Sequence, residues 1–190
     1  PIHVTTGKQV HSANVAIVSE EDRGRGGHAG LPAFPDTDGL VTNVAALPLV
    51  ISIADCVPVF MLDPAHNAIG LVHAGRVGTE NSIALVALEV MRDAFGTRPH
   101  DVHAVIGPSA GPDAYEVSDE MAGEFASRGF PVRGRCIDLW RANAIQLESF
   151  GVPLDQRDRE TILRFHAEFM REALALRFSS FNRGGTGYPT

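Results

Sequence analysis

The sequence predicts an α/β or α+β domain, because β-like segments alternate with helical patterns around a long central β set. Two apolar runs, at residues 57–62 and 68–73, flank the turn-forming word D-P-A-H-N. Apolar residues recur at helical spacing after residue 79, and again after Ser118. With 190 residues, 44% of them hydrophobic, the chain has the size of one compact domain, which we place at residues 1–190.

The overall charge and the cysteine count narrow the classes of function. A net charge of −7 argues against a nucleic-acid surface, which needs clustered Lys and Arg. No apolar run has the length of a membrane span, and the first residues do not form a signal peptide, so we expect a cytoplasmic protein. Two cysteines are too few for a disulfide framework, which agrees with a reducing compartment.

The first third of the chain offers two histidines and a carboxylate. His11 precedes a short β-like run at residues 15–18, and as a lone residue it is a surface histidine. Residues 20–35 are rich in Gly and Arg, which predicts a mobile surface loop with His28 solvated or acting as a lid. Asp38 follows this loop and is either a turn former or a carboxylate that orients a histidine ligand.

The central stretch places a cysteine and a histidine close together. Residues 51–54 and 57–62 are predicted as strands broken near Pro58, since proline cannot donate to a strand ladder. The chain then turns and returns through residues 68–73, which brings His73 near Cys56. Thiolate and imidazole can hold zinc or act as nucleophile and base, while a lone buried cysteine is more often inert.

A helix is predicted from residue 79 to Phe95, ended by Gly96. Gly75 and Gly78 would lie just before its first turn, where free backbone amides can bind an anion such as phosphate. Further on we expect a central strand at residues 102–107, a helix capped by Ser118, and a strand that leads into a helix at residues 136–150. Cys136 is predicted as a core thiol, and a last helix is predicted at residues 158–176 with His166 at the edge of its apolar face.

Several short motifs of this sequence occur in a fixed order. They are Q-V-H at residues 9–11, D-G-L-V-T at 38–42, A-D-C-V-P-V at 54–59, H-A-G at 73–75, G-P-S-A-G-P at 107–112 with Y-E-V at 115–117, and D-L-W at 138–140. Together they resemble the multicopper polyphenol oxidoreductase (laccase-domain) family, YfiH-like proteins that are described as zinc-dependent purine nucleoside phosphorylases. The resemblance runs from about Gln9 to Gly187.

The resemblance implies a fold and a site. The fold would be layered mixed β-sheets flanked by helices, related to the catalytic domain of cytotoxic necrotizing factor toxins. His11, Cys56 and His73 would hold Zn²⁺ and leave a fourth position open. The substrates would be a purine nucleoside (adenosine or inosine) and phosphate, with deamination of adenosine as a further activity. Asp38, Gly75, Gly78, Arg76 and Arg183 would bind substrate or phosphate, in a monomer or homodimer.

The chain departs from the family pattern at several positions. The Trp of H-A-G-W-R-G is absent and Arg76 is displaced by one residue. Asp113 and Ala114 replace a pair of cysteines, and Asn182 stands where an arginine is expected near Arg183. We expect that the amino-terminal segment of the family is missing. Metal binding is therefore a firmer expectation than full phosphorylase activity.

Three other functions stay open at the level of the sequence. Cys56 and His73 could form the nucleophile and base of a hydrolase or deamidase. Polyphenol oxidation with copper is a poorer explanation, since a multicopper site needs many histidines from several motifs and the chain has eight in total. A divergent, non-catalytic zinc protein is the third. On a role in peptidoglycan editing the residues are silent.

Overall fold

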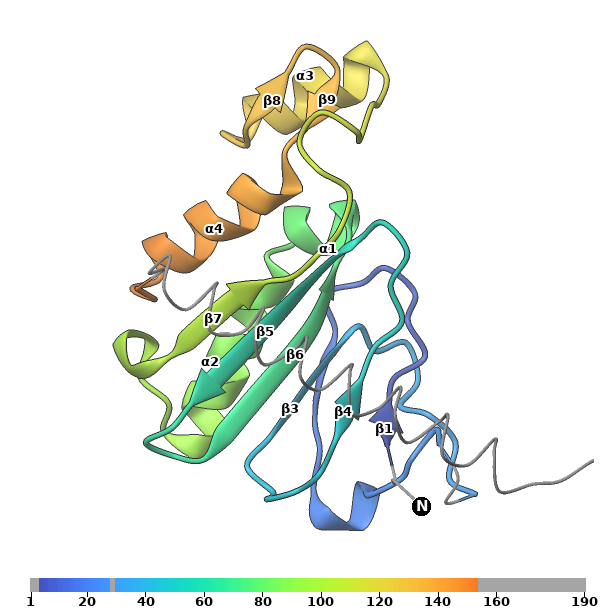
Figure 1. The fold of residues 1–190 in the computed structure, drawn as a ribbon, viewed down its shortest axis with the longest axis vertical. Coiled ribbons are helices and arrows are strands. Elements are labelled where there is room, and N and C mark those ends of the chain that lie inside the picture. Colours follow the sequence, from blue (N-terminus) through green and yellow to red (C-terminus); the bar gives the residue numbers. More distant parts are fainter. Residues whose placement is uncertain (1–3, 28–29, 154–190) are drawn as a thin grey trace, which may run out of the picture. The chain divides into compact units, whose positions relative to one another are not determined.

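The computed structural model describes residues 4–27 and 30–153 (Figure 1). Its main sheet has five strands in the order β2-β3-β6-β5-β7, where β2–β3 is parallel and the other pairs are antiparallel. The strands of this sheet are β2 (Val15–Ile17), β3 (Gly39–Thr42), β5 (Val57–Asp63), β6 (Ala68–Ala74) and β7 (His103–Ile106). Two short pairs accompany it, formed by β1 (Thr5–Thr6) with β4 (Leu49–Val50) and by β8 (Val132–Arg133) with β9 (Cys136–Ile137).

Helices complete the core, and the third of them packs on the β8–β9 pair and not on the main sheet. The helices are α1 (Arg76–Glu80), α2 (Ile83–Phe95), α3 (Asp119–Ser127) and α4 (Leu139–Ser149), with short 3-10 turns at Glu20–Asp22 and Pro99–Asp101. Helix α2 contacts β2, β3 and β6, and α4 contacts α2 and β7. Burying each large apolar side chain of this layer contributes about 1.5–3 kcal/mol. The mixed sheet with helices against it confirms the predicted fold class.

The hairpin of β5 and β6 is the centre of the sheet and sets the position of the site. Its antiparallel register pairs Val59 with Val72, and Pro58 with His73. The predicted outgoing and returning strands are therefore confirmed. Since β5 begins at Val57, Cys56 lies at the end of the hairpin where His73 also lies, as the sequence predicted.

Four local predictions differ from the structure. The helix expected from residue 79 is two helices, because Ser82 has a left-handed backbone (φ 56°) between α1 and α2. Residues 51–54 form no strand, since the backbone of Ser52 bonds to the side chain of Gln9 instead of a neighbouring strand. Strand β7 ends the order of the described sheet and is not central. Cys136 is half-buried, with its thiol 3.7 Å from the Asp113 carbonyl oxygen, and is no core residue.

The segment predicted as a mobile loop, residues 20–35, is fixed by polar contacts where the structure describes it. Arg23 donates to the Glu20 carboxylate and to the carbonyl oxygen of Ala46. Arg25 pairs with Asp22, and its guanidinium lies over the ring of Phe34. His28 lies outside the described residues.

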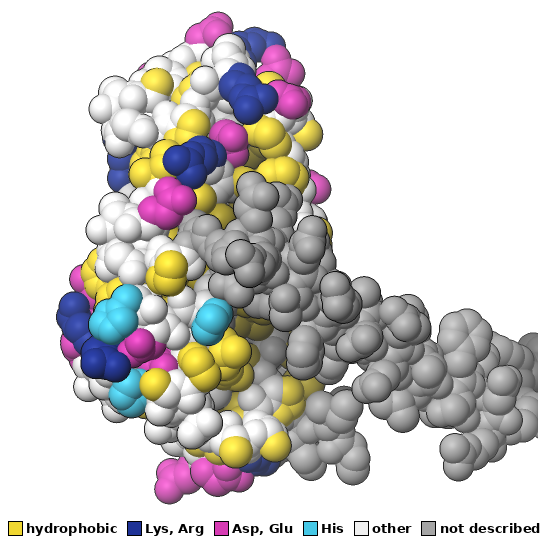
Figure 2. Space-filling view, turned by 60° about the vertical axis from the view of Figure 1, so that its left-hand side comes forward, with side chains coloured by type: hydrophobic (Ala, Val, Ile, Leu, Met, Phe, Trp, Pro, Cys, Tyr) yellow, Lys and Arg dark blue, Asp and Glu magenta, His cyan; other side chains and the backbone are white. Residues whose placement is uncertain are grey.

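Two predictions of helix ends agree with the structure. Gly96, with φ 80°, ends α2, and the Ser118 hydroxyl accepts from the Met121 amide at the start of α3. On the face shown in Figure 2, basic and acidic side chains are interspersed. No helix in the described ranges is both long and apolar enough to span a bilayer.

The turn between β5 and β6 is built around Asp63, which has no exposed surface. Its carboxylate accepts from the amide of Ala65 (2.9 Å) and lies 2.7 Å from Nδ1 of His66. Burial alone would raise the pKa of Asp63, but the neighbouring Thr97 hydroxyl, the His66 ring and the turn amides outweigh it and lower that pKa. The charged form of Asp63 therefore stabilises the hairpin that carries Cys56 and His73.

We expect Asp63→Asn to lower the free energy of unfolding at pH 7 by about 1–3 kcal/mol, because buried charge-assisted hydrogen bonds are lost. A carboxyl with a depressed folded pKa stabilises above its unfolded pKa, near 4, and this contribution is lost as the pH falls through the folded pKa. Urea unfolding of both proteins at several pH values should show the gap closing on acidification. Asp93→Asn, at an exposed position, is the control; an equal gap at every pH would contradict the prediction.

Candidate functional site

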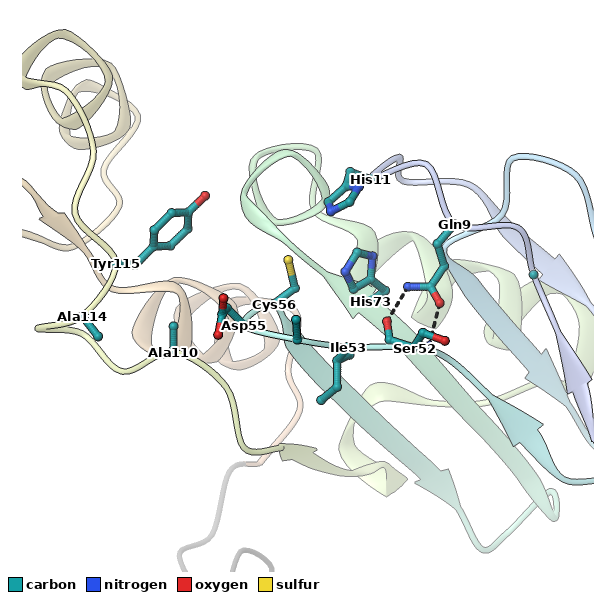
Figure 3. A pocket seen from close by; sticks show the side chains of 12 residues that line it. Gln9, His11, Ser52, Ile53, Asp55, Cys56, His73, Ala110, Ala114 and Tyr115 are labelled. Atoms are coloured by element: carbon teal, nitrogen blue, oxygen red, sulfur yellow. Dashed lines mark hydrogen bonds between the residues drawn. The ribbon is translucent and has the colours of Figure 1, made fainter. Parts of the chain in front are cut away.

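Three potential metal ligands from three separate segments converge at one end of the sheet. His11 lies in the loop before β2, Cys56 precedes β5, and His73 is in β6 (Figure 3). Their ligand atoms all lie within 4.8 Å of one another. His73 is buried, Cys56 is half-buried and His11 is exposed, so the group opens to the surface on the side of His11. The sequence prediction that His73 lies near Cys56 agrees with this geometry.

The donor set fits a transition metal such as zinc. A tetrahedral zinc centre has bonds of about 2.0–2.3 Å, which places its ligand atoms roughly 3.5 Å apart. The three atoms therefore need only small side-chain movements to reach a common ion. Two imidazoles and a thiol suit zinc or copper far better than magnesium or calcium, which prefer oxygen ligands.

Asp38 connects two of these ligands through one buried carboxylate. The amides of Val10, His11 and Ser12 donate to it at 3.1, 3.0 and 2.8 Å, and the Ser12 hydroxyl donates at 2.8 Å. The ring of His73 lies 2.9 Å away through Nδ1. An ionised carboxylate can only accept, so Nδ1 of His73 carries a proton, and Nε2 is the ring atom left to act as a metal ligand.

The same carboxylate stabilises an unfavourable backbone conformation. His11 has a left-handed backbone with φ 61°, which is uncommon for a residue with a side chain. Three successive amides bonded to Asp38 fix the loop in this form. Asp38 therefore acts both as a turn former and as a partner of a histidine, the two alternatives that the sequence left open. With no exposed surface and no place in the pocket wall, it does not itself face a ligand.

The acid–base properties of Asp38 and Cys56 are shifted in opposite directions. Burial would raise the pKa of Asp38, but hydrogen bonds from His73, Ser12 and Val10 outweigh it and lower that pKa. Burial, followed by the charges of Asp55 and Asp38, raises the pKa of the Cys56 thiol. Without a nearby cation, this thiol therefore stays protonated more readily than a free cysteine, and a bound metal ion would reverse that preference.

Gly75 and Gly78 lie beside the group, and their roles differ from the prediction. Gly75 caps α1, and a Cβ at this position would come within 2.9 Å of the Cys56 sulfur, so a side chain would crowd the thiol. Gly78 is inside α1 and not before it. Arg76 donates to both carboxylate oxygens of Glu80, at 2.8 and 3.0 Å, and is not part of the pocket wall. Arg183 lies outside the described residues.

Side chains of helix α4 make hydrogen bonds to helix α1, next to the site. The Asn143 amide donates to the Thr79 hydroxyl at 2.9 Å, and Thr79 donates to the carbonyl oxygen of Ala74. Gln146 donates to the carbonyl oxygen of Thr79 at 2.8 Å. These buried bonds fix the chain immediately after His73.

The donors open into a cavity of about 980 Å³, a volume in the usual range for ligand sites. Its walls are Gly7, Gln9, His11, residues 52–56, His73, Ala110, Ala114 and Tyr115. Sequence reasoning assigned no role to Gln9, Asp55 or Tyr115. Gln9 and Tyr115 do belong to the Q-V-H and Y-E-V words, which was the available signal. Gln9 pairs with the backbone of Ser52 through both ends of its amide, at 2.8 and 2.7 Å, and so ties two walls of the cavity together.

The fold and this site define a mixed α+β domain with a His–Cys–His group at the end of a central hairpin. Residues 1–168 match the family described as multi-copper polyphenol oxidoreductase laccase, and the chain belongs to this family. The resemblance inferred from the sequence is thereby confirmed.

Similar proteins carry names of one activity. The chain is 34% identical over 156 residues to the protein named purine nucleoside phosphorylase YlmD of Geobacillus stearothermophilus, covering 77% of this chain and 57% of that protein. A Bacteroides thetaiotaomicron protein named purine nucleoside phosphorylase is 35% identical over 173 residues, covering 85% and 64%. The chain thus spans less than two thirds of the length of these relatives.

Solved structures show the same fold. The crystal structure of YlmD from Geobacillus stearothermophilus matches with a TM-score of 0.72 and 32% identity, over 80% of this chain and 60% of that chain. The structure of the hypothetical protein YfiH from Bacillus licheniformis matches with a TM-score of 0.73 and 30% identity, over 80% and 61%.

Proposed function

We propose that the 190 residues act as one cytoplasmic domain that binds Zn²⁺ and cleaves purine nucleosides with phosphate, yielding the base and ribose 1-phosphate. The observation that carries this proposal is the convergence of His11, Cys56 and His73 within 4.8 Å beside an open cavity. Three protein ligands with a free fourth position are typical of catalytic rather than structural zinc sites. The names of the relatives supply the reaction.

Each residue of the site has a separate task in this proposal. His11, Cys56 and His73 hold the ion, and Asp38 orients the His73 ring by accepting from Nδ1, which leaves Nε2 to bind the ion. Gly75 leaves room for the Cys56 sulfur. When bound, the metal supplies a Lewis acid that stabilises negative charge as it develops.

Phosphate needs a positive partner, and the described wall of the cavity contains neither Lys nor Arg. Arg76 is engaged by Glu80, so its release would cost that ion pair. The candidates for the phosphate contact remain those of the family pattern, which are the amides near Gly75 and Gly78, Arg76 and Arg183; Arg183 lies outside the described residues. Asn182, in place of an arginine, predicts weak phosphate binding.

Metal analysis combined with a phosphate-dependent assay on adenosine and inosine tests the proposal. We expect one zinc per chain, and base release that requires both zinc and phosphate. Arg183→Ala should weaken phosphate affinity about 10- to 100-fold, because a charged hydrogen bond contributes about 1.5–3 kcal/mol. Arg92→Ala, which removes an exposed arginine of α2, is the control. Turnover that does not depend on phosphate, or that persists after zinc is removed, would contradict the proposal. Ammonia release from adenosine in the same assay would reveal the expected deaminase activity.

A second candidate function has a specific observation in its favour. The contacts from Cys56 to His73 and from His73 to Asp38 resemble those of the nucleophile, base and orienting carboxylate of cysteine hydrolases. The raised pKa of the Cys56 thiol argues against it, because such enzymes need a ready thiolate. The hydrolase would be favoured if the zinc-free protein is active and alkylation of Cys56 abolishes this activity.

A further inference from the structure

Two polar groups in the cavity wall, the Asp55 carboxylate and the Tyr115 hydroxyl, make no hydrogen bond within the described parts of the chain. They lie on the opposite side of Cys56 from the two histidines (Figure 3). The carbonyl oxygen of Asp55 accepts from the Ala110 amide at 3.0 Å, which fixes the segment carrying Tyr115 against the loop carrying Asp55. Their positions are therefore set by the backbone, while their side chains are free to bind.

The chemistry of Asp55 limits what it can bind. A carboxylate has two oxygens and, when ionised, only accepts hydrogen bonds. Phosphate is excluded as its partner by charge, so the partner must be a donor. Two neighbouring hydroxyl groups, one for each oxygen, satisfy the carboxylate fully. The vicinal 2′- and 3′-hydroxyls of ribose have this arrangement.

Tyr115 suits the other half of a nucleoside. It is the one aromatic ring in the described wall, apart from the two histidine rings, and the small residues Ala110 and Ala114 lie beside it. Bases stack on aromatic side chains in many nucleic-acid sites, and this contact tolerates different bases. Such a ring beside small side chains leaves room for a flat purine.

Resting on the proposed function, we propose that Asp55 and Tyr115 form the nucleoside-recognition wall of the site. Asp55 binds the two ribose hydroxyls, and the ring of Tyr115 stacks on the purine. The sugar then lies next to Cys56 and the metal ligands, where the glycosidic bond must be cleaved. Asp55 thereby selects ribonucleosides over 2′-deoxyribonucleosides, since a deoxy analogue leaves one carboxylate oxygen without its donor.

Equilibrium binding to the zinc-loaded 190-residue chain, without phosphate, tests this assignment independently of turnover. The probes are adenosine, inosine and 2′-deoxyadenosine. We expect the wild type to bind adenosine about tenfold more tightly than 2′-deoxyadenosine, and inosine as tightly as adenosine. Asp55→Asn should weaken adenosine binding about tenfold and leave 2′-deoxyadenosine nearly unchanged, so that the preference disappears. Tyr115→Leu should weaken all three alike, while Tyr115→Phe, which keeps the ring, should weaken none.

Asp113→Asn is the matched control, because Asp113 is an exposed carboxylate on the same segment that lies outside the cavity wall. Zinc content should stay at one per chain in every variant. If Asp55→Asn weakens the binding of adenosine and 2′-deoxyadenosine equally, the ribose assignment is wrong. It is also wrong if this variant weakens the binding of adenosine but not that of inosine, because Asp55 would then contact the base. Failure of the wild type to bind any nucleoside would overturn the proposed function as well.

Discussion

Cys56→Ala and His73→Ala are each expected to reduce bound zinc from one ion per chain to almost none. An open site with three protein ligands keeps only two after either change, and two ligands hold zinc poorly at neutral pH. Loss of a residue that only hydrogen-bonds to a metal ligand already lowers metal affinity about 10- to 100-fold, and loss of a ligand itself should lower it more. The measurement is elemental analysis of purified protein after dialysis against a weak chelator.

Cys136→Ala is the matched control for these variants. Cys136 is also half-buried, but it lies in β9 and outside the group of three ligands. This variant should keep one zinc per chain. Circular dichroism of all the proteins separates loss of metal from loss of fold. Zinc at one per chain in Cys56→Ala and His73→Ala would show that the site is assigned to the wrong residues.

Asp38→Asn is expected to lower the free energy of unfolding by about 3 kcal/mol, because several buried donors lose a charged acceptor and one such hydrogen bond contributes about 1.5–3 kcal/mol. The asparagine side chain offers one acceptor oxygen where Asp38 now accepts from three amides, a hydroxyl and an imidazole. Its NH₂ group would also face these donors. Zinc affinity should fall about 10- to 100-fold, since His73 loses its orienting partner.

Urea unfolding in the presence of a chelator measures the first effect without a contribution from metal, and competition with a zinc indicator measures the second. Asp36→Asn makes the same chemical change two residues away, at an exposed side chain without a hydrogen bond in the described structure. It should alter neither quantity. Wild-type stability and zinc affinity in Asp38→Asn would mean that the carboxylate is not what holds the two histidine segments together.

The sequence was most informative where local pattern and tertiary structure agree. The β5–β6 hairpin, the end of α2 at Gly96 and the cap of α3 at Ser118 all follow from short-range signals. The break between α1 and α2 was missed, because a left-handed serine is stabilised by its surroundings and not by its own propensity. Residues 51–54 have β propensity, but Gln9 occupies their hydrogen-bonding edge.

The three proposed ligands could be predicted because they are cysteine and histidine residues in motifs of a known family. The β5–β6 hairpin explains why two of them lie close together. The sequence offered two roles for Asp38 but could not show that both apply, since donors from residues 10–12 and from His73 together define them. The pairing of Arg76 with Glu80 was missed although the two residues stand four apart on one helix. The contacts of Asp55 and Tyr115 depend on how the segment after β7 returns to the site, which no local pattern specifies.

The origin of the three ligands in three separate segments links metal binding to folding. An ion held by His11, Cys56 and His73 would be bound by the folded chain alone, because unfolding moves the three ligands apart. Ligand binding to the native state adds about 2.7 kcal/mol of stability at a free concentration one hundred times the dissociation constant. The melting temperature would then report the free zinc concentration of the medium, and metal supply would determine how long the chain persists against proteolysis.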